Sequence, residues 1–297
     1  MSLEGRVVIV TGAGGGLGRA HARYLASQGA KVVVNDLEQA TAETVAGEIV
    51  AAGGQAMAVA GSVTDEAAVS ALVRRTMQTW GRVDILVNNA GILRDKSFAK
   101  LSLDDFRLVV EVHLMGAVIC SKAVWEIMRE QRHGRIVMTT SSSGLYGNFG
   151  QANYGAAKMA LVGLMQTLAI EGEKYGIKVN CLAPTAATPM TQGVLSEAGL
   201  DRLDPALVSP GLLALVGEEA PTRAILCAGA GHFARASVTL SRGVDVTAWA
   251  HPGEQVVARW DAISDRTGEI VPAYGFVQAE RELASAGMTD PVAATAR

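Results

Sequence analysis

A short apolar run followed by a glycine-rich turn, near the N-terminus, places the strongest limit on how this chain can fold. Residues 6–10 have the composition of a buried parallel strand, and 19–28 has that of a helix. Between them lies a Thr-Gly-x-x-x-Gly-x-Gly pattern, made by Thr11, Gly12, Gly16 and Gly18. Such glycines permit a tight turn and let the backbone approach a pyrophosphate at the positive end of the helix. The segment therefore predicts the opening strand, turn and helix of a dinucleotide-binding sheet.

The spacing of this turn differs from the common G-x-G-x-x-G pattern, because Leu17 stands where the third glycine would be. A flexible glycine-rich loop is the alternative interpretation. The position of the turn between a strand and a helix favours the binding motif, and Leu17 is then expected to lie against the cofactor with its neighbours.

Asp36 ends a second apolar run, residues 31–35, and lies 18 positions after Gly18. A carboxylate near that distance accepts hydrogen bonds from the adenosine ribose and repels a 2′-phosphate, which favours NAD over NADP. Two alternatives stay open: Asp36 could cap the helix that follows, and Arg19 could attract a 2′-phosphate.

The middle of the chain alternates apolar runs with helical stretches. Further strands are expected at 56–60, 83–87, 135–140, 177–182 and 223–228, and helices at 65–79, 104–131 and 152–174. This alternation predicts an α/β fold, a Rossmann-type doubly wound parallel sheet of about seven strands with helices on both faces. We expect one catalytic domain over 1–243, with an apolar lid at 189–216, and a C-terminal extension, 244–297, as an appendage of the same domain.

Tyr154 and Lys158 are four residues apart in the predicted helix at 152–174, and Ser141 precedes Tyr154 by thirteen positions. Residues i and i+4 share a helix face, so the ammonium is expected beside the phenol. A nearby cation favours the phenolate and is expected to lower the pKa of Tyr154. The pair would then form an acid–base group for an alcohol oxygen, with the Ser141 hydroxyl holding the same oxygen.

Composition excludes several classes of function. The chain has 297 residues, 49% of them hydrophobic, and a net charge of −3, so no basic surplus is available for nucleic acid or an anionic membrane. Three cysteines indicate a reducing, cytoplasmic setting. No metal-ligand spacing is evident, and no apolar run of about 18 residues predicts a membrane-spanning helix.

Together these residues resemble the short-chain dehydrogenase/reductase family over about 1–230. The motifs that carry the resemblance are the glycine turn, Asn88-Asn89-Ala90-Gly91, Ser141, Tyr154 and Lys158. The resemblance implies hydride transfer between NAD and a carbonyl or alcohol. It implies that Tyr154 is the general acid/base, that Lys158 also binds the nicotinamide ribose, and that Ser141 holds the reacting oxygen. It further implies cofactor contacts from Asn89, Ala90, Gly91, Ser62, Val63 and Pro184.

The chain departs from the common family pattern at several positions. His113 stands where many members have an asparagine that supports a proton relay, so His113 is a candidate catalytic residue, with a packed core histidine as the alternative. Ser62 replaces the usual acid beside the adenine. Thr185 follows Pro184 in place of glycine, and Thr188 is the candidate ligand of the nicotinamide carboxamide.

Within the family, the segments around 92–98, 146–154 and 169–172 resemble the (3R)-hydroxyacyl-CoA dehydrogenase domains of peroxisomal type 2 multifunctional enzymes. This resemblance implies an acyl-CoA or steroid substrate and a homodimer or homotetramer. Arg94, Lys96 and Lys100 are candidate cations for the phosphates of CoA. Two alternatives remain, an NADPH-dependent 3-oxoacyl-carrier-protein reductase and a non-catalytic NAD-binding sensor.

Overall fold

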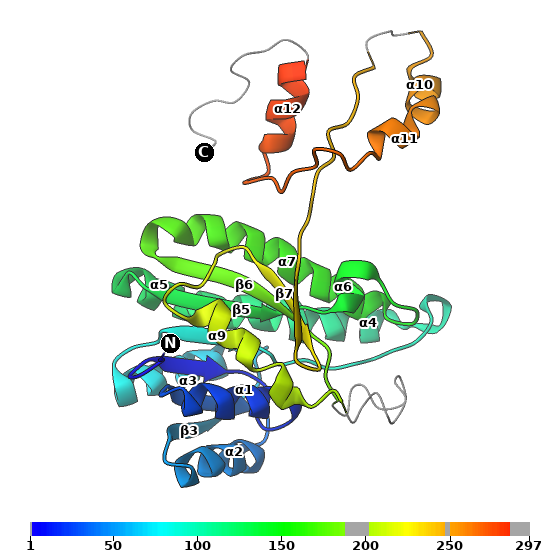
Figure 1. Cartoon of the computed structure of the whole chain (residues 1–297). Helices are drawn as coiled ribbons and strands as arrows, with labels where there is room; N and C mark the ends of the chain where they lie inside the picture. Colours follow the sequence, from blue (N-terminus) through cyan, green and yellow to red (C-terminus); the bar gives the residue numbers. More distant parts are fainter. Residues whose placement is uncertain (1, 188–201, 247–249, 286–297) are drawn as a thin grey trace. The chain divides into compact units, whose positions relative to one another are not determined.

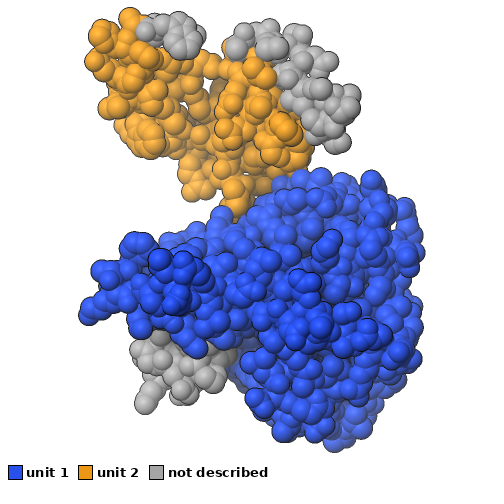
Figure 2. All heavy atoms as spheres, turned by 180° about the vertical axis from the view of Figure 1, so that it is seen from behind, with its two compact units in different colours: residues 1–236 blue, residues 237–297 orange. Residues whose placement is uncertain are grey.

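The computed structural model describes residues 2–187, 202–246 and 250–285. The chain divides into two compact units, residues 1–236 and 237–297 (Figure 2). The predicted boundary, between 243 and 244, lies close to this division. Of the predicted lid, only residues 202–216 fall within the described part of the chain; Thr188 and the apolar positions Met190, Val194, Leu195 and Leu200 lie outside it.

The first unit is built on one sheet, whose strand order is β3-β2-β1-β4-β5-β6-β7-β8 (Figure 1). The strands are β1 (Val7–Val10), β2 (Lys31–Asp36), β3 (Gln55–Ala60), β4 (Ile85–Asn88), β5 (Gly134–Thr139), β6 (Ile177–Pro184), β7 (Ile225–Gly229) and β8 (His232–Ala236). Strands β1 to β7 are parallel, and β8 pairs with β7 in the antiparallel direction. The order reverses beside β1, where open α/β sheets bind their ligands.

The prediction of about seven strands misses β8. This edge strand is mostly exposed and has no apolar run, so its sequence carries no burial signal. A two-residue turn joins it to β7. Ala230 and Gly231 both have positive φ in this turn, 50° and 75°, as the twist of a tight hairpin requires.

Helices cover both faces of the sheet (Figure 1). They are α1 (Gly16–Ser27), α2 (Gln39–Ala51), α3 (Glu66–Trp80), α4 (Leu103–Val110), α5 (Gly116–Gln131), α6 (Ser142–Tyr146), α7 (Ala152–Gly172) and α9 (Pro210–Val216). Residues of α1, α2 and α9 share one core cluster, and those of α3, α5 and α7 share the other. The sequence analysis gives no range for α2 or α6: two of the four buried residues of α2 are alanines, which contrast little with their neighbours.

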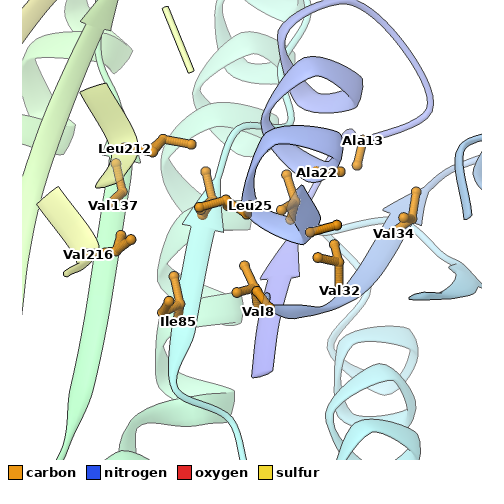
Figure 3. Close-up of a cluster of buried hydrophobic side chains, with 14 of the residues drawn as sticks. Val8, Ala13, Ala22, Leu25, Val32, Val34, Ile85, Val137, Leu212 and Val216 are labelled. Carbon is orange, nitrogen blue, oxygen red and sulfur yellow. The ribbon is translucent and has the colours of Figure 1, made fainter. Parts of the chain in front are cut away.

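The first core cluster anchors the glycine turn (Figure 3). Val8 on β1, Val32 on β2 and Ile85 on β4 are fully buried, and they pack with Ala22 and Leu25 of α1. The alanine side chain lets the helix axis come close to the sheet. The start of α1 is therefore held just beyond the carboxyl end of β1, with the turn between them.

The predicted helix at 104–131 is formed by α4 and α5 with one π-turn between them, Glu111–Met115. By length and composition, Leu103–Gln131 would also suit a membrane crossing, a test that the core helix of a globular domain also passes. Here Ala117, Cys120, Val124 and Met128 pack in the second core cluster. A π-turn adds a residue to the helix and is frequent at functional sites, and this one contains His113.

The second unit contains α10 (Pro252–Ala258), α11 (Trp260–Ile263) and α12 (Val277–Ser285). Leu240 and Ile270 form an isolated antiparallel bridge, and the Tyr274 hydroxyl donates to Glu280. Among the described residues of this unit, none is fully buried.

Candidate active site

A cleft of about 620 Å³ lies at the carboxyl ends of β1, β2, β4, β5 and β6. Every predicted catalytic or dinucleotide-binding residue within the described part of the chain lines it. These residues are Gly12, Gly16, Leu17, Gly18, Asp36, Ser62, Val63, Asn89, Ala90, Gly91, His113, Ser141, Tyr154, Lys158 and Pro184. Thr188 lies outside the described residues. One cleft therefore combines the glycine turn with the Ser-Tyr-Lys group.

The glycine turn leaves no room for side chains at two of its positions. Gly12 has φ of +60°, and a β-carbon there would lie 2.8 Å from Cα of Ala90. A β-carbon on Gly18 would lie 2.1 Å from the carbonyl oxygen of Gly12. With α1 beginning at Gly16, the exposed backbone and the free N–H groups of the first helical turn fit the pyrophosphate of a dinucleotide.

Asn89 fixes this turn to the neighbouring strand. Its Nδ2 donates to the carbonyl oxygens of Thr11 and Gly12, at 2.9 and 3.0 Å. In return, Oγ1 of Thr11 accepts from the backbone N–H groups of Asn89 and Ala90. The sequence predicts that Asn89 contacts the cofactor. The structure shows a further role, since the hydrogen bonds between Asn89 and Thr11 join the ends of β4 and β1.

Asp36 does not cap the helix that follows it. One carboxylate oxygen accepts from the N–H of Gly14 at 2.8 Å and the other from the N–H of Leu37 at 2.8 Å, while α2 begins after Glu38. The capping interpretation is therefore wrong. Arg19, the candidate for a 2′-phosphate, instead forms a two-bond ion pair with Glu48.

Ser62 and Val63 follow β3 and line the same end of the cleft. The Ser62 hydroxyl hydrogen-bonds that of Thr64 at 2.8 Å. Val63 is buried and packs against Gly116, where a β-carbon would lie 2.6 Å from the valine Cγ2. This contact explains why α5 begins with glycine.

Ser141, Tyr154 and Lys158 come together from two elements. Ser141 caps α6, and its Oγ accepts from the N–H of Ser143 at 3.2 Å. Tyr154 and Lys158 lie on α7, with the lysine Nζ 5.4 Å from the centre of the tyrosine ring. Nζ donates to the carbonyl oxygen of Thr139 at 2.5 Å, which holds the buried ammonium beneath the cleft.

Taken together, the protein's own groups raise the pKa of Tyr154, which corrects the expectation from the sequence. Burial of the phenol raises its pKa, the hydrogen bond with Ser141 lowers it, and the charge of Asp95 raises it, with a net rise. Burial also lowers the pKa of Lys158 to about 7. The lysine is thus only partly charged near neutrality, because desolvation outweighs the benefit of its one carbonyl partner.

His113 lies in the π-turn, and its ring is nearly perpendicular to that of Tyr154, at 87°, with the two ring centres 5.2 Å apart. Its Nε2 is 3.0 Å from the N–H of Ile92 and 2.7 Å from the carbonyl oxygen of that residue. Burial and the charge of Lys158 lower the pKa of His113 to about 3. The imidazole is therefore neutral near pH 7 and acts there as a hydrogen-bonding group rather than a cation.

A second, much smaller cavity of about 10 Å³, the size of one water molecule, lies behind the cleft. Asn88, His113 and Lys158 are among the residues that line it. Within the described residues, Oδ1 of Asn88 and Nδ1 of His113 are buried without a hydrogen-bond partner. The polar side chains around this cavity therefore continue from Lys158 toward the start of α5.

Sequence reasoning missed one wall of the cleft. Ser142, Ser143, Asn148 and Gln151 line it alongside Tyr154. The glutamine precedes the tyrosine by three positions, one helical turn, and this spacing is the only sequence signal for it. Two expected CoA-binding cations, Arg94 and Lys96, instead pair with Asp105, at 3.8 and 3.5 Å.

No group of three or more His, Cys, Asp or Glu side chains suited to a metal ion occurs within 2–187, 202–246 and 250–285. The donors of the cleft are hydroxyl, amide, phenol and amine groups, a set suited to holding a dinucleotide and a small organic substrate.

Three curated proteins are similar to this chain in sequence. The chain is 43% identical over 283 residues to a short-chain type dehydrogenase/reductase of Mycobacterium tuberculosis, covering 92% of this chain and 98% of that protein. It is 50% identical over 216 residues to peroxisomal multifunctional enzyme type 2 of Drosophila melanogaster, covering 70% of this chain and 36% of that enzyme. It is 43% identical over 198 residues to a 3-oxoacyl-[acyl-carrier-protein] reductase of Synechocystis, covering 66% of this chain and 80% of that enzyme.

Two solved structures share the fold. That of the full-length Drosophila enzyme matches with a TM-score of 0.80 and 35% identity, covering 96% of this chain and 50% of that one. A 7α-hydroxysteroid dehydrogenase complexed with NADH and 7-oxo glycochenodeoxycholic acid matches with a TM-score of 0.71 and 30% identity. The match covers 77% of this chain and 95% of that one. The model of a family described as short chain dehydrogenase matches residues 6–198. The chain therefore belongs to the short-chain dehydrogenase family of oxidoreductases, whose members bind a nicotinamide cofactor.

Proposed function

We propose that this protein is an NAD-dependent dehydrogenase that interconverts a secondary alcohol and a ketone, with a 3-hydroxyacyl-CoA as its substrate. One observation carries the proposal: the Ser141, Tyr154 and Lys158 group lines the same cleft as the glycine turn and Asp36. A nicotinamide bound there supplies the hydride acceptor or donor. The non-catalytic sensor is not supported, since the family is one of oxidoreductases.

The side chains of the cleft divide the remaining work. In the oxidation direction, Tyr154 takes the hydroxyl proton of the substrate, and Ser141 holds the same oxygen by a hydrogen bond. Lys158, whose Nζ is held by the carbonyl oxygen of Thr139, would donate to the nicotinamide ribose. The rise in the pKa of the phenol that burial causes means that this direction is favoured by alkaline pH.

Asp36 supports the choice of NAD over NADP. Two backbone N–H groups, those of Gly14 and Leu37, hold its carboxylate at the end of β2. The group is thus fixed in the cleft as an acceptor for ribose hydroxyls, and its charge opposes a 2′-phosphate. Arg19, with its guanidinium paired to Glu48, offers that phosphate no free cation.

The substrate class is supported by likeness and by size. The resemblance to (3R)-hydroxyacyl-CoA dehydrogenase domains favours an acyl thioester. The cleft volume of about 620 Å³ lies in the range of pockets that bind small molecules and cofactors. A 3-oxoacyl-carrier-protein reductase using NADPH is the second candidate, and the likeness to the Synechocystis enzyme favours it.

Steady-state rates with NAD and NADP, each measured with 3-hydroxyacyl-CoA substrates of several chain lengths and with estradiol, test the proposal. We expect the highest kcat/KM for NAD with a 3-hydroxyacyl-CoA. A preference for NADPH and an acyl-carrier-protein substrate in the reduction direction would support the second candidate instead.

A further inference from the structure

We propose that the side-chain amide of Gln151, held by Asp95, Ser143 and Asn148, binds the thioester carbonyl oxygen of the substrate and selects neutral 3-hydroxyacyl thioesters over free 3-hydroxy acids. The inference rests on the proposed function, because it assigns a residue to one part of that substrate.

Three hydrogen bonds fix the orientation of the Gln151 amide. Its Oε1 accepts from the Ser143 hydroxyl at 2.8 Å and from Nδ2 of Asn148 at 3.2 Å. Its Nε2 donates to a carboxylate oxygen of Asp95 at 2.6 Å. A primary amide has two N–H donors, and the second has no partner among the residues that the structure describes. A flip of the amide would set its oxygen against the Asp95 carboxylate and its Nε2 against Nδ2 of Asn148, so these two partners fix the amide with its nitrogen toward Asp95.

The position of Gln151 suits a second oxygen on the substrate. Gln151 is at the N-cap position of α7, where its side chain makes no capping bond, and it precedes Tyr154 by three residues; both line the cleft. Side chains three positions apart at the start of a helix are neighbours. In a 3-hydroxyacyl thioester only one methylene separates the carbinol carbon from the thioester carbonyl. With the hydroxyl at Ser141 and Tyr154, the carbonyl oxygen comes within the same small region. A simple secondary alcohol has no such oxygen.

Backbone and side-chain hydrogen bonds hold the segment that contains Asp95 against the segment that contains Gln151. The N–H of Lys96 donates to the carbonyl oxygen of Gly150 at 2.9 Å, and Nδ2 of Asn153 donates to that of Arg94 at 3.1 Å. These bonds join 94–96 to 150–153, so that Asp95 stays beside Gln151. A donor with so many fixed neighbours loses little freedom when it binds a ligand.

The charge around Gln151 disfavours a carboxylate. Asp95 lies directly behind the amide, and its charge also raises the pKa of the Tyr154 phenol, so the field of Asp95 reaches the reacting oxygen. Lys158 is the only lysine or arginine among the described residues that line the cleft. Arg94 and Lys96, the basic neighbours of Asp95, are paired with Asp105. A free acid would thus meet a neutral donor and a like charge, whereas a thioester meets only the donor.

The test compares kcat/KM for three substrates: 3-hydroxybutyryl-CoA, free 3-hydroxybutyrate and 2-butanol. We expect Gln151→Leu to lower the value for the thioester by about 3- to 10-fold more than it lowers the value for 2-butanol, the effect of one neutral hydrogen bond. Asp95→Asn should raise the value for the free acid relative to the thioester. Gln278→Leu is the matched control, because the Gln278 amide also donates to a carboxylate, that of Glu282, but in the second unit.

Two results would overturn the inference: equal losses for the thioester and 2-butanol in Gln151→Leu, or an unchanged acid-to-thioester ratio in Asp95→Asn. Asp95 is exposed, so its variant keeps the inference testable if Gln151→Leu fails to fold. The proposed function fails separately, and visibly, if the wild-type protein oxidises other alcohols with NAD but no 3-hydroxyacyl thioester.

Discussion

The imidazole of His113 occupies the space that a side chain on residue 91 would need. A β-carbon on Gly91 would lie 2.2 Å from Cε1 of His113 and 2.9 Å from its Nδ1. The two residues are complementary: the glycine after β4 admits the ring, and the ring then bonds the backbone of Ile92 through Nε2. A histidine in the π-turn and a glycine at this position therefore depend on each other.

Gly91→Ala should displace the His113 ring and destabilise the protein by about 1–3 kcal/mol, the usual cost of overpacking a filled site. The measurement is the free energy of chemical unfolding of the wild type, of Gly91→Ala, of His113→Ala and of the double variant. Gly91→Ala combined with His113→Ala should cost clearly less than the sum of the two single changes. Strictly additive free energies would show that the two positions do not interact.

Tyr154→Phe should reduce turnover by at least about 100-fold, because positioned acid–base groups typically contribute 10²- to 10⁴-fold. The variant keeps the ring and its packing beside His113, so NADH binding, followed by fluorescence titration, should be unchanged. Tyr175→Phe, at a half-buried site next to Arg129 and outside the cleft, is the control. Near-normal turnover in Tyr154→Phe would remove the tyrosine from the mechanism.

Asp36→Asn should lower kcat/KM for NAD by roughly 10-fold or more, since a charged acceptor is lost where hydrogen bonds to charged groups contribute about 1.5–3 kcal/mol. The ratio of kcat/KM for NADP to that for NAD should rise, because the repulsion of a 2′-phosphate is removed. Asp65→Asn, at the cap of α3, changes the same charge away from the cleft and serves as the control. An unchanged cofactor ratio would contradict the assignment of Asp36.

Lys158→Met should stabilise the fold at and below pH 7, and the difference should shrink as the pH rises toward 10.5. The pKa of Lys158 is about 7 in the folded chain, against 10.5 as the ordinary value. Between these values the unfolded chain binds the extra proton, so the stability of the wild type increases with pH. Thermal unfolding at pH 6, 8 and 10 measures the difference. A constant difference across that range would mean that the folded and unfolded lysine titrate alike.

Asp95→Asn should shift the alkaline rise of the oxidation rate to lower pH. The carboxylate raises the pKa of the Tyr154 phenol, and the phenolate is the form that accepts the substrate proton, so removal of the charge makes that form available at lower pH. The pH profile of kcat with saturating NAD measures the shift, and Asp104→Asn, whose carboxylate is almost fully exposed on α4, is the control. A shift in the opposite direction would exclude this electrostatic effect.

Local sequence was sufficient for the positions of β1 to β7, for the glycine turn and for the spacing of Tyr154 and Lys158. Apolar runs, glycine breaks and helical periodicity are short-range signals, and they report which segments are buried and where the backbone must turn tightly. The pairing of β8 and the helix α2 escaped this reasoning, since neither has a strong contrast between buried and exposed positions.

The chemistry inside the cleft depended on tertiary structure. Gln151 and Asp95 are 56 positions apart, Asn89 and Thr11 are 78 apart, and nothing in the spacing of either pair predicts their hydrogen bonds. The sequence places a cation beside Tyr154, but only the fold buries both groups, and this burial raises the pKa of the phenol and lowers that of the lysine. Sequence patterns thus identify the catalytic and cofactor-binding groups at the edge of the sheet. The burial of each group and its hydrogen-bond partners are decided only when segments that are distant in the sequence pack together.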